Sequence, residues 1–516
     1  MKQTSMPKHI AILGGGTAGW MAATMLRKRW PAKQVEISVI ESDSIGIIGV
    51  GEGSTPQLKA FFDTIGVTEY EWMPACNATY KIGIRFNHWS SLPGGESYFH
   101  PFPSSLDKHV AQAFVYNNYL RRQGYDIQGH PDAYFVQARL ADRHLAPQPL
   151  DNFPFPVHYG YHFDSHRLGQ FLKEKAVQWG VTHRYATISD VQQHPDGSIK
   201  SLVTDAGGAV DADMFIDCSG FTGLLIQKTL QVPFVSFKNN LFNDSAVVLP
   251  AGRQREIKAQ TEATAMSNGW RWQIPLTNRT GNGYVYSSQY TSGDDAETEL
   301  RSALGLLDSD IEARHLTMKV GQVKEHWSKN CLALGLSQGF IEPLEATALH
   351  VVQTTIELFA QCYEQGGFTT QYQAQLNRQI SERFEGIRDY IVCHYKVNGR
   401  TDGLYWRDNA ENTALSASLT SLLEVWQKGG DVAEEIQRQR IGHFYNPISW
   451  HCLLAGYAAY RGVVAKKPLT RDIDRFNSDS IQDFASRCAT NFPRHEAQLE
   501  LLVSTKNSQY KSEGLN

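Results

Sequence analysis

The chain has 516 residues, 41% of them hydrophobic, and a net charge of -4. This length is too great for one compact core, so we expect two or more lobes, and the charge balance offers no basic surface for nucleic acid. No apolar run is long enough to cross a bilayer, and the N-terminus lacks a signal-peptide core, so membrane insertion and secretion are disfavoured. The seven scattered cysteines, without a C-x-x-C pair, are typical of reduced thiols in a cytoplasmic protein and disfavour disulfides or a bound metal.

The first predicted elements are a strand, a glycine turn, a helix and a second strand that ends in acid. Gly14, Gly16 and Gly19 stand in G-x-G-x-x-G register, and Glu41 follows about twenty residues later. Glycines let the backbone approach a pyrophosphate at a helix N-terminus, and an acid at this distance can accept from a ribose hydroxyl. The pattern predicts an α/β, Rossmann-like module. We find no second fingerprint of this kind, so we expect one dinucleotide and no docking module for NAD(P)H.

Two later segments look like parts of the same module. Residues 211–225 read as a buried strand running into a Ser-Gly-Phe turn, and 330–363 as a strand, a glycine loop and a long helix. Both resemble the segments with which one-dinucleotide flavoproteins close over FAD. We therefore expect a discontinuous FAD-binding module at 1–85, 156–231 and 311–375. The substrate lobe is expected at 86–155 and at 232–310, and the second of these stretches is rich in β-structure. A mostly helical substrate region is expected at 376–516.

Lys81 lies among apolar and aromatic neighbours in an alternating stretch, "NATYKIGIRFNHW". A lysine there is most often a surface residue whose stem packs on apolar side chains, and a catalytic lysine is the alternative.

The stretch "GWRWQIPL" places Trp270 and Trp272 two residues apart in a predicted strand, so both indoles face the same side. Pro275 suits the end of a strand. A core strand and a functional wall both fit this pattern.

Two acids lie in "FIEPLEATALH". Pro343 suits the first turn of a helix, whose free N–H groups can bind an anion. Glu342 and Glu345 also fit helix-start carboxylates favoured by the helix dipole.

Taken together, these motifs resemble the flavin-dependent tryptophan halogenases. The resemblance covers most of the chain, and its most specific element is W-x-W-x-I-P. It rests on G-G-G-T-A-G at 14–19, G-E-G-S-T-P at 51–56, Tyr80 with Lys81, W-x-W-x-I-P at 270–275, G-F-I-E-P-L-E-A-T at 339–347, "YGYHFDSHRL" at 159–168 and "IRDYIVCHY" at 387–395.

The resemblance implies an FADH2- and O2-dependent halogenase. Reduced FAD from a separate flavin reductase would form a flavin hydroperoxide, and chloride or bromide would attack it to give hypohalous acid. This oxidant would pass to a second pocket and halogenate a small electron-rich arene such as an indole. Lys81 matches the lysine that captures or directs the hypohalous acid, and Glu345 matches the carboxylate beside it. The resemblance leaves open whether the protein forms a homodimer.

The resemblance also implies binding residues. For FAD they are Gly14, Gly16, Thr17, Ala18, Gly19, Glu41, Gly51, Ser54, Leu336 and Leu349; for the halide they are the amides of Thr347 and Ala348. For the substrate and the passage from the flavin they are His100, Phe102, Trp270, Trp272, Ile274, Pro275 and Trp450, with the two tryptophans of the strand as a wall that Pro275 fixes.

The sequence departs from the family pattern in two places. Ala346 and Ala348 stand where many tryptophan-specific members have serine and glycine. The segment 442–452 is short, and no acid lies between Tyr445 and Trp450 to hold an amino-acid group. We therefore expect an aromatic slot without an amino-acid clamp.

Two rival functions remain on the sequence alone. A flavin-dependent aromatic hydroxylase would give an oxygenated product without halide. A non-catalytic flavin-binding redox protein would tolerate the loss of Lys81 and Glu345, yet both residues are present.

Overall fold

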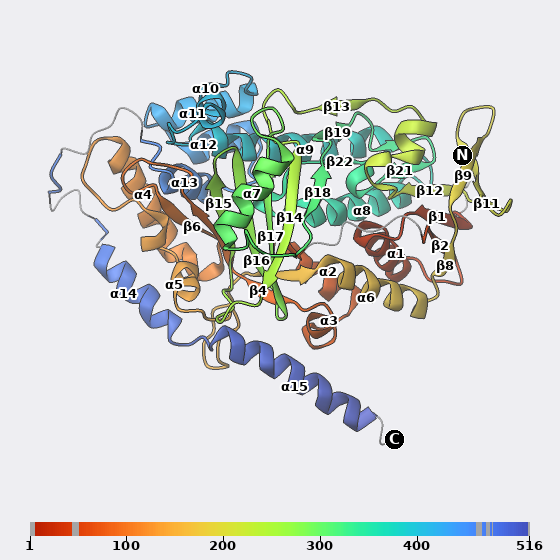
Figure 1. The fold of residues 1–516 in the computed structure, drawn as a ribbon, viewed down its shortest axis with the longest axis horizontal. Coiled ribbons are helices and arrows are strands. Elements are labelled where there is room, and N and C mark those ends of the chain that lie inside the picture. The colour runs from red at the N-terminus through yellow and green to blue at the C-terminus, as the bar shows by residue number, and fades with distance from the viewer. Residues whose placement is uncertain (1–5, 44–50, 461–466, 471–474, 477, 514–516) are drawn as a thin grey trace. The chain divides into compact units, whose positions relative to one another are not determined.

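The computed structural model describes residues 6–43, 51–460, 467–470, 475–476 and 478–513, and the chain divides into two compact units (Figure 1). Each unit is built from three separate stretches of sequence. The first unit comprises Met1–Asn77, Phe163–Lys238 and Met318–Glu385, and the second comprises Ala78–His162, Asn239–Thr317 and Gly386–Asn516.

The core of the first unit is a six-stranded sheet in the order β20-β21-β12-β1-β2-β8, parallel except for β20. Its central strand β1 (His9–Leu13) is almost wholly buried, as expected of an apolar run in a parallel sheet. The turn after β1 leads into α1 (Thr17–Arg29), and β2 (Glu36–Glu41) completes the predicted strand–helix–strand unit. The fold class expected from the sequence is confirmed.

The remaining strands of this sheet are β8 (Thr182–Tyr185), β12 (Met214–Asp217), β20 (Trp327–Ser328) and β21 (Cys331–Ala333). Two small antiparallel sheets of the first unit consist of β9 (Ile188–Gln193), β10 (Ile199–Thr204) and β11 (Ala209–Asp211), and of β13 (Phe234–Ser236), β19 (Gly321–Val323) and β22 (Gly339–Phe340). The unit also contains β3 (Gly51–Gly53), α2 (Gln57–Ile65), α3 (Glu69–Ala75), α6 (Ser165–Gln178) and α8 (Ala348–Gln365).

The second unit is organised around a seven-stranded sheet in the order β18-β14-β17-β16-β15-β5-β6. Its strands are β5 (Gly83–Asn87), β6 (Ser97–Pro101), β14 (Ser245–Gly252), β15 (Thr261–Met266), β16 (Gly269–Pro275), β17 (Arg279–Tyr286) and β18 (Arg314–Thr317). Helix α7 (Gly293–Leu304) covers one face, where Ala296 and Leu300 pack with Val247, Leu249 and Tyr284 (Figure 1).

The opposite face of this sheet carries the aromatic side chains discussed below. Helices α9 (Gln373–Lys396), in the part from Gly386 onward, and α13 (Pro447–Gly456) contribute to its cover. The remaining elements are β4 (Thr79–Lys81), α4 (Lys108–Arg122), α5 (Val136–Asp142), β7 (Gly160–Asp164), α10 (Leu404–Glu411), α11 (Ala417–Gln427), α12 (Val432–Gln439), α14 (Ser478–Ala489) and α15 (His495–Glu513).

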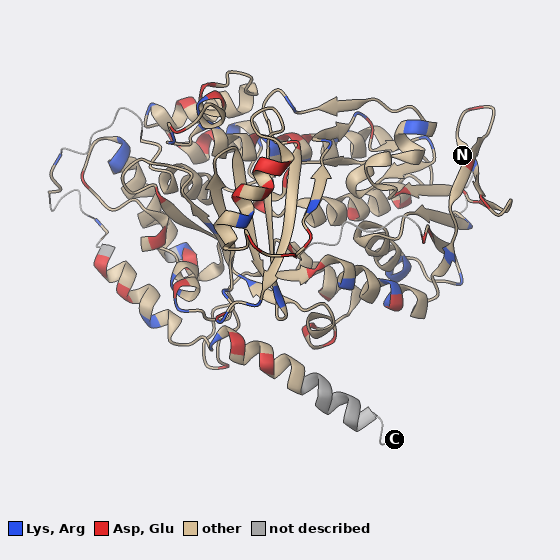
Figure 2. Ribbon diagram, in the orientation of Figure 1, with Lys and Arg blue, Asp and Glu red and all other residues tan. Residues whose placement is uncertain are grey.

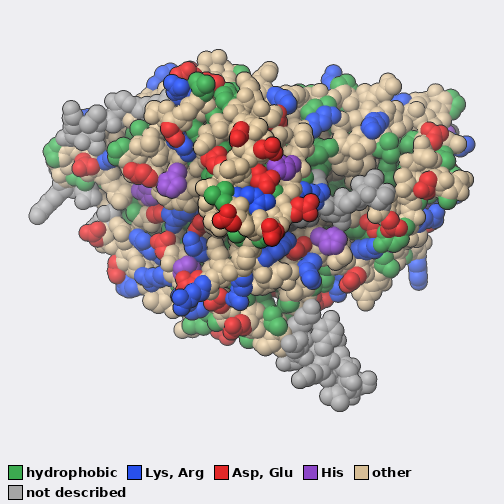
Figure 3. Space-filling model, in the orientation of Figure 1, with side chains coloured by type: hydrophobic (Ala, Val, Ile, Leu, Met, Phe, Trp, Pro, Cys, Tyr) green, Lys and Arg blue, Asp and Glu red, His purple; other side chains and the backbone are tan. Residues whose placement is uncertain are grey.

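Charged residues of both signs are interspersed along the ribbon (Figure 2), and the face drawn in Figure 3 mixes acidic, basic and hydrophobic side chains. All seven cysteines are free, and six of them are buried, consistent with the reduced thiols expected from the sequence. Within the described residues, no helix combines the length and apolarity that crossing a membrane requires.

Candidate active site

The glycine turn of the first unit brings backbone close to backbone. A side-chain carbon on Gly14, whose φ is +117°, would lie 2.2 Å from the carbonyl oxygen of Cys218. One on Gly19 would lie 2.0 Å from the carbonyl oxygen of Gly14. Gly16, by contrast, has open space around its missing side chain and precedes α1 without a side-chain cap. The turn therefore offers bare backbone and free helix N–H groups, which fit a dinucleotide pyrophosphate.

Glu41 lies at this turn, as the sequence predicts. Its carboxylate packs so closely on Gly15 that a side-chain carbon there would lie 1.6 Å from Oε2. Lys173 Nζ and His183 Nε2 lie 2.9 Å and 2.7 Å from its Oε1. Burial lowers the pKa of Lys173, but hydrogen bonds to Tyr185 and Glu41 outweigh this and raise it. Neither partner of Glu41 was predicted, because both come from segments more than 130 residues further along the chain.

The other predicted FAD residues all belong to the first unit. Thr17 and Ala18 form the first turn of α1, and Leu336 lies in the turn Gly335–Ser337. That turn packs on α1, since a side-chain carbon on Gly335 would lie 2.9 Å from Cβ of Ala18. Gly51 begins β3, buried Ser54 follows it, and Leu349 lies in the first turn of α8.

Glu52, between Gly51 and Ser54, is an ionisable residue that our sequence interpretation passed over. Burial raises its pKa to about 7, although a hydrogen bond with Ser165 opposes the shift. Such a value lies far above that of an ordinary glutamate. Its position inside the G-E-G-S-T-P motif was the available signal, but nothing in the motif shows that this carboxyl is shielded from water.

The segment before α8 differs from the prediction. Pro343 begins a helical turn, as expected, but this turn is not the first turn of the long helix α8. Pro343–Glu345 form a separate 3-10 turn, and Ala346 follows with φ of 54° and ψ of 37° in the left-handed region. This residue breaks the chain direction before Thr347 leads into α8. Glu345 is therefore not part of α8, and Ala346, in a strained backbone conformation, lies between the two.

Glu342 and Glu345 both stand at the start of this short helix, as the alternative interpretation has it, and they are almost fully buried, with 1% and 6% of their surface exposed. Ala348 is the first residue of α8 and has an ordinary helical backbone, which accepts a Cβ without strain. No side chain caps α8 through Thr347. The amides at this N-terminus are therefore compatible with an anion despite the replacement of glycine by alanine.

Lys81 lies in the second unit, on β4, with no exposed surface. Its Nζ is 5.5 Å from the ring centroid of Phe102, within the range of a cation–π contact. A lysine is almost never fully buried without a specific reason. The surface interpretation of Lys81 is therefore wrong.

Trp270 and Trp272 lie on one face of β16, as predicted, with ring centroids 6.2 Å apart. Gly283 lies opposite Trp272 on β17, where a side-chain carbon would be 2.0 Å from the indole, so the glycine gives the ring room to lie across the strand. Trp270 also packs with Trp89 at 6.5 Å, so it serves the core as well. Pro275 is the last residue of β16.

Sheet register places His100 on the same face as the two tryptophans. His100 is opposite Ile84, and Ile84 is opposite Thr261. Ala263, two residues further along β15, is opposite Trp272. Since residues two apart point to the same face of a strand, His100 and Trp272 share a face of one sheet, as does Ile274.

Tyr390 lies between His100 and Trp450. Its ring meets His100 edge-on at 6.3 Å and Trp450 edge-on at 4.7 Å, and Tyr445 stacks on it at 3.6 Å with an interplanar angle of 3°. The predicted pair His100 and Trp450 is thus linked by a residue that was not predicted. The segment "IRDYIVCHY" contains Tyr390, but sequence gave no reason to select this aromatic from its neighbours.

Asp389, the acid beside Tyr390, already binds two other side chains. Asp389 binds Arg388 at 2.9 Å and the Ser416 hydroxyl at 2.6 Å. Burial raises its pKa. This carboxylate is therefore part of a local ion pair and hydrogen bond.

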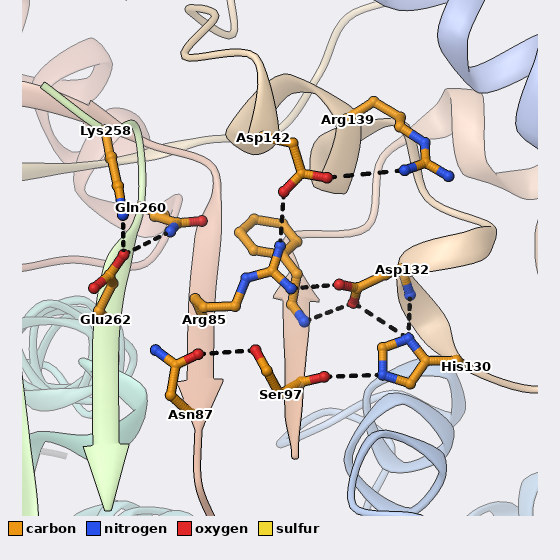
Figure 4. A network of polar contacts seen from close by, with 11 residues as sticks. Arg85, Asn87, Ser97, His130, Asp132, Arg139, Asp142, Lys258, Gln260 and Glu262 are labelled. Atoms are coloured by element: carbon orange, nitrogen blue, oxygen red, sulfur yellow. Dashed lines mark hydrogen bonds and ion pairs between the residues drawn. The ribbon is translucent and has the colours of Figure 1, made fainter. Parts of the chain in front are cut away.

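The opposite face of the same strands carries a polar network (Figure 4). Arg85 of β5 binds Asp132, and its second terminal nitrogen lies 3.1 Å from Asp142. Asp132 also accepts from the Phe99 amide of β6 at 2.7 Å, and His130 contacts the Ser97 carbonyl. This network fastens β5 to β6 and so supports the strand that presents His100.

Comparison with known proteins identifies the family. The family model for tryptophan halogenase matches residues 9–471. The chain is 36% identical to the 7-chloro-L-tryptophan 6-halogenase KtzR of Kutzneria sp. (strain 744), over 94% of this chain and 98% of that protein.

Solved structures agree with this relationship. Tryptophan 6-halogenase SttH from Streptomyces toxytricini matches with a TM-score of 0.83 and 32% identity, over 95% of this chain and 98% of that one. Xcc4156, a flavin-dependent halogenase from Xanthomonas campestris, matches with a TM-score of 0.81 and 31% identity, over 96% and 98%. The chain therefore belongs to the tryptophan halogenase family and is a flavin-dependent halogenase.

Proposed function

We propose that this protein halogenates a small indole-like arene with hypohalous acid, using FAD reduced by a separate flavin reductase. The observation that carries the proposal is the complete burial of Lys81 in the same unit as the aromatic cluster of His100, Tyr390, Tyr445 and Trp450, which we take as the lining of the substrate slot. A buried ammonium group can donate hydrogen bonds in a low-dielectric setting, where they act most strongly on an electrophile.

FAD fits the first unit because Gly14 and Gly19 let the turn close against the carbonyls of Cys218 and Gly14, while the space around Gly16 at the start of α1 is open for a pyrophosphate. Reduced FAD, when bound, would give two electrons to O2, and the oxygen thus brought to the peroxide level would be the two-electron oxidant that converts halide to hypohalous acid. The amides of Thr347 and Ala348 at the start of α8 hold the halide. These residues bind and orient the reactants without themselves changing their protonation.

Lys81 orients the hypohalous acid by hydrogen bonding and raises its electrophilicity only where the substrate carbon lies, which is an effect of proximity and charge. Glu345 polarises the reagent or accepts the proton that leaves as the arene regains aromaticity. Its burial keeps water from competing for that carboxylate.

Trp270 and Trp272 exclude organic substrates and bulk water from the route that halide and hypohalous acid take. Both indoles are at least 93% buried on one face of β16, and Pro275 ends this strand. Excluding water limits the wasteful loss of a reactive species.

The substrate slot favours an apolar ring over an amino acid. Tyr445 stacks on Tyr390 and lines the slot with aromatic surface, and the neighbouring Asp389 is held by Arg388 and Ser416. A zwitterion entering this slot would lose hydration without a paired carboxylate. Indole is therefore the preferred substrate over free tryptophan, with attack at its most electron-rich carbon, C3. Bromide is preferred over chloride because it is more easily oxidised and less strongly hydrated.

The test is incubation of the protein with FAD, a flavin reductase, NADH and either halide over a panel of indoles and phenols, with mass detection of products. We expect halogenated indole that depends on halide, on reductase and on Lys81. An oxygenated product formed without halide, or rapid NADH oxidation by the protein alone, would contradict the proposal.

A further inference from the structure

Three side chains and one backbone carbonyl of the second unit form a buried chain of hydrogen bonds next to Lys81. Thr79 Oγ1 donates to the Pro275 carbonyl at 2.7 Å and lies 3.0 Å from His162 Nδ1. His162 Nε2 lies 2.9 Å from Thr261 Oγ1. Thr79 and His162 have no exposed surface, and Thr261 is 8% exposed.

The direction of this chain follows from counting hydrogens. The single hydroxyl hydrogen of Thr79 is committed to the Pro275 carbonyl, which can only accept, so His162 Nδ1 must carry the hydrogen between these two side chains. In a neutral imidazole, Nε2 then accepts from the Thr261 hydroxyl. Burial, and next the positive charge of Lys81, depress the pKa of His162 well below its usual range, which keeps the ring neutral.

The chain joins the strand of Lys81 to the strand of the two tryptophans. Thr79 and Lys81 are two residues apart on β4 and therefore point to the same face. Pro275 is the last residue of β16, and Thr261 opens β15, which pairs with β16. Three hydrogen bonds thus fix the position of β4 relative to β16, the strand of Trp270 and Trp272, which we call the wall strand.

A second histidine holds the same strand through its backbone. The N–H of Tyr80, between Thr79 and Lys81, donates to His495 Nε2 at 3.1 Å. His495 Nδ1 then donates to the Ile257 carbonyl at 3.0 Å. Thr79, two residues before Lys81, is therefore held by its side chain, and Tyr80, directly before Lys81, is held by its backbone, although β4 is only three residues long.

We propose that Thr79 and His162, with Thr261 and the Pro275 carbonyl, are positioning residues that hold Lys81 in register with the wall strand, so that hypohalous acid is delivered to the arene and does not escape. Lysine has four rotatable side-chain bonds, so its ammonium group is placed accurately only if its backbone is fixed. A displacement of about 1 Å is enough to cost on the order of 100-fold in rate. This inference rests on the function proposed above.

The experiment measures where the oxidised halide goes. The wild-type protein is incubated with FAD, a flavin reductase, NADH, bromide, indole, catalase and free methionine. Escaped hypobromous acid gives its oxygen to the methionine sulfur, which becomes the sulfoxide, while the bromine leaves as bromide with a proton. The ratio of bromoindole to methionine sulfoxide then reports delivery, and their sum reports total halide oxidation.

Thr79→Val keeps the side-chain shape and removes the hydroxyl. We expect its ratio of bromoindole to sulfoxide to fall about tenfold or more while the sum stays within about twofold. Thr79→Ser, which restores the hydroxyl, should recover most of the wild-type ratio. Thr24→Val, at a fully buried threonine of α1 that bonds only within its own helix, is the matched control and should leave the ratio unchanged.

Thr261→Val breaks only the outer hydrogen bond and should shift the ratio less, so it tests the chain if Thr79→Val does not fold. Two results would show that the chain of hydrogen bonds is merely structural. One is a wild-type ratio in the variants, and the other is a parallel loss of both products that Thr79→Ser does not reverse. A wild-type protein that forms neither product would overturn the proposed function, and this inference with it.

Discussion

The proposed binding sites of the two units differ in what they are made of. In the first unit the site is mostly backbone, with bare glycines before α1 and free amides at the start of α8. In the second unit it is made of side chains, with a buried lysine and stacked rings on one sheet face. A backbone site is damaged by adding one carbon atom, whereas a side-chain site is damaged by removing a functional group. The two sites should therefore respond oppositely to small substitutions.

The largest effect is expected at the side-chain site. Lys81→Met should lower arene halogenation by about 10²–10³-fold, because the variant loses a buried donor aimed at the reagent. Reduced-flavin oxidation and thermal stability should stay near wild-type, since methionine fills the same volume without a buried charge. Steady-state product formation and flavin absorbance check this. Lys258→Met, at a partly exposed lysine of the same unit, is the control. Loss of flavin oxidation would contradict the division of roles between the units.

Substrate preference should follow the rings of the slot. The value of kcat/KM for indole should exceed that for tryptophan by about 10–100-fold, the cost of leaving one or two polar groups unpaired. Tyr445→Ala should narrow this preference because it removes the ring stacked on Tyr390. Competition between the two substrates, with product positions from NMR, measures both. Efficient chlorination of tryptophan at a benzo-ring carbon would reveal an amino-acid clamp, for which residues 396–440 are the first place to look.

At the backbone site the comparison can be made between two glycines of one turn. Gly16→Ala should fold normally, because no protein atom lies within 4 Å of the added Cβ. Its affinity for FAD should fall about tenfold or more, because the Cβ would lie where the pyrophosphate approaches the backbone. Gly14→Ala should not fold stably, because its Cβ would lie 2.2 Å from the Cys218 carbonyl oxygen. Gly252→Ala, also in open space but in the second unit, is the control. Fluorescence titration of FAD and thermal melts separate these outcomes.

A further prediction within the first unit concerns the pH dependence that Glu52 gives to stability. Its pKa is raised to about 7 in the folded protein, so between the ordinary glutamate value and this one the folded state binds more protons than the unfolded state. The free energy of unfolding should therefore fall as the pH rises from about 4.5 to 7. Glu52→Gln should flatten this dependence. Urea titrations between pH 5 and pH 8 measure it, and parallel curves for both proteins would contradict the shift.

The sequence predicted those parts of the molecule that depend on adjacent residues. The strand, glycine turn and helix over β1 and α1 were predicted because each step is local, and so was the shared face of Trp270 and Trp272. Tyr390 escaped prediction because its importance comes from His100, Tyr445 and Trp450, which reach it from distant segments.

Local rules also failed where a single residue took an unfavourable conformation. Proline followed by free N–H groups predicted a helix start at Pro343, and a 3-10 turn does begin there, but Ala346 adopts the left-handed region and the long helix α8 begins only at Ala348. Alanine rarely adopts this conformation, so no propensity could have indicated it. The roles of Lys81, Glu345 and the predicted FAD and halide residues stay predictions until the variants are measured.

The position of His495 has a consequence for synthesis of the protein. The strand of Lys81 is held in part by a ring that lies at the first residue of α15. During translation, β4 emerges more than 400 residues before this ring does. A nascent or truncated chain that lacks His495 leaves the amide of Tyr80 without this acceptor. The surroundings of Lys81 are therefore completed only after nearly the whole chain has been made.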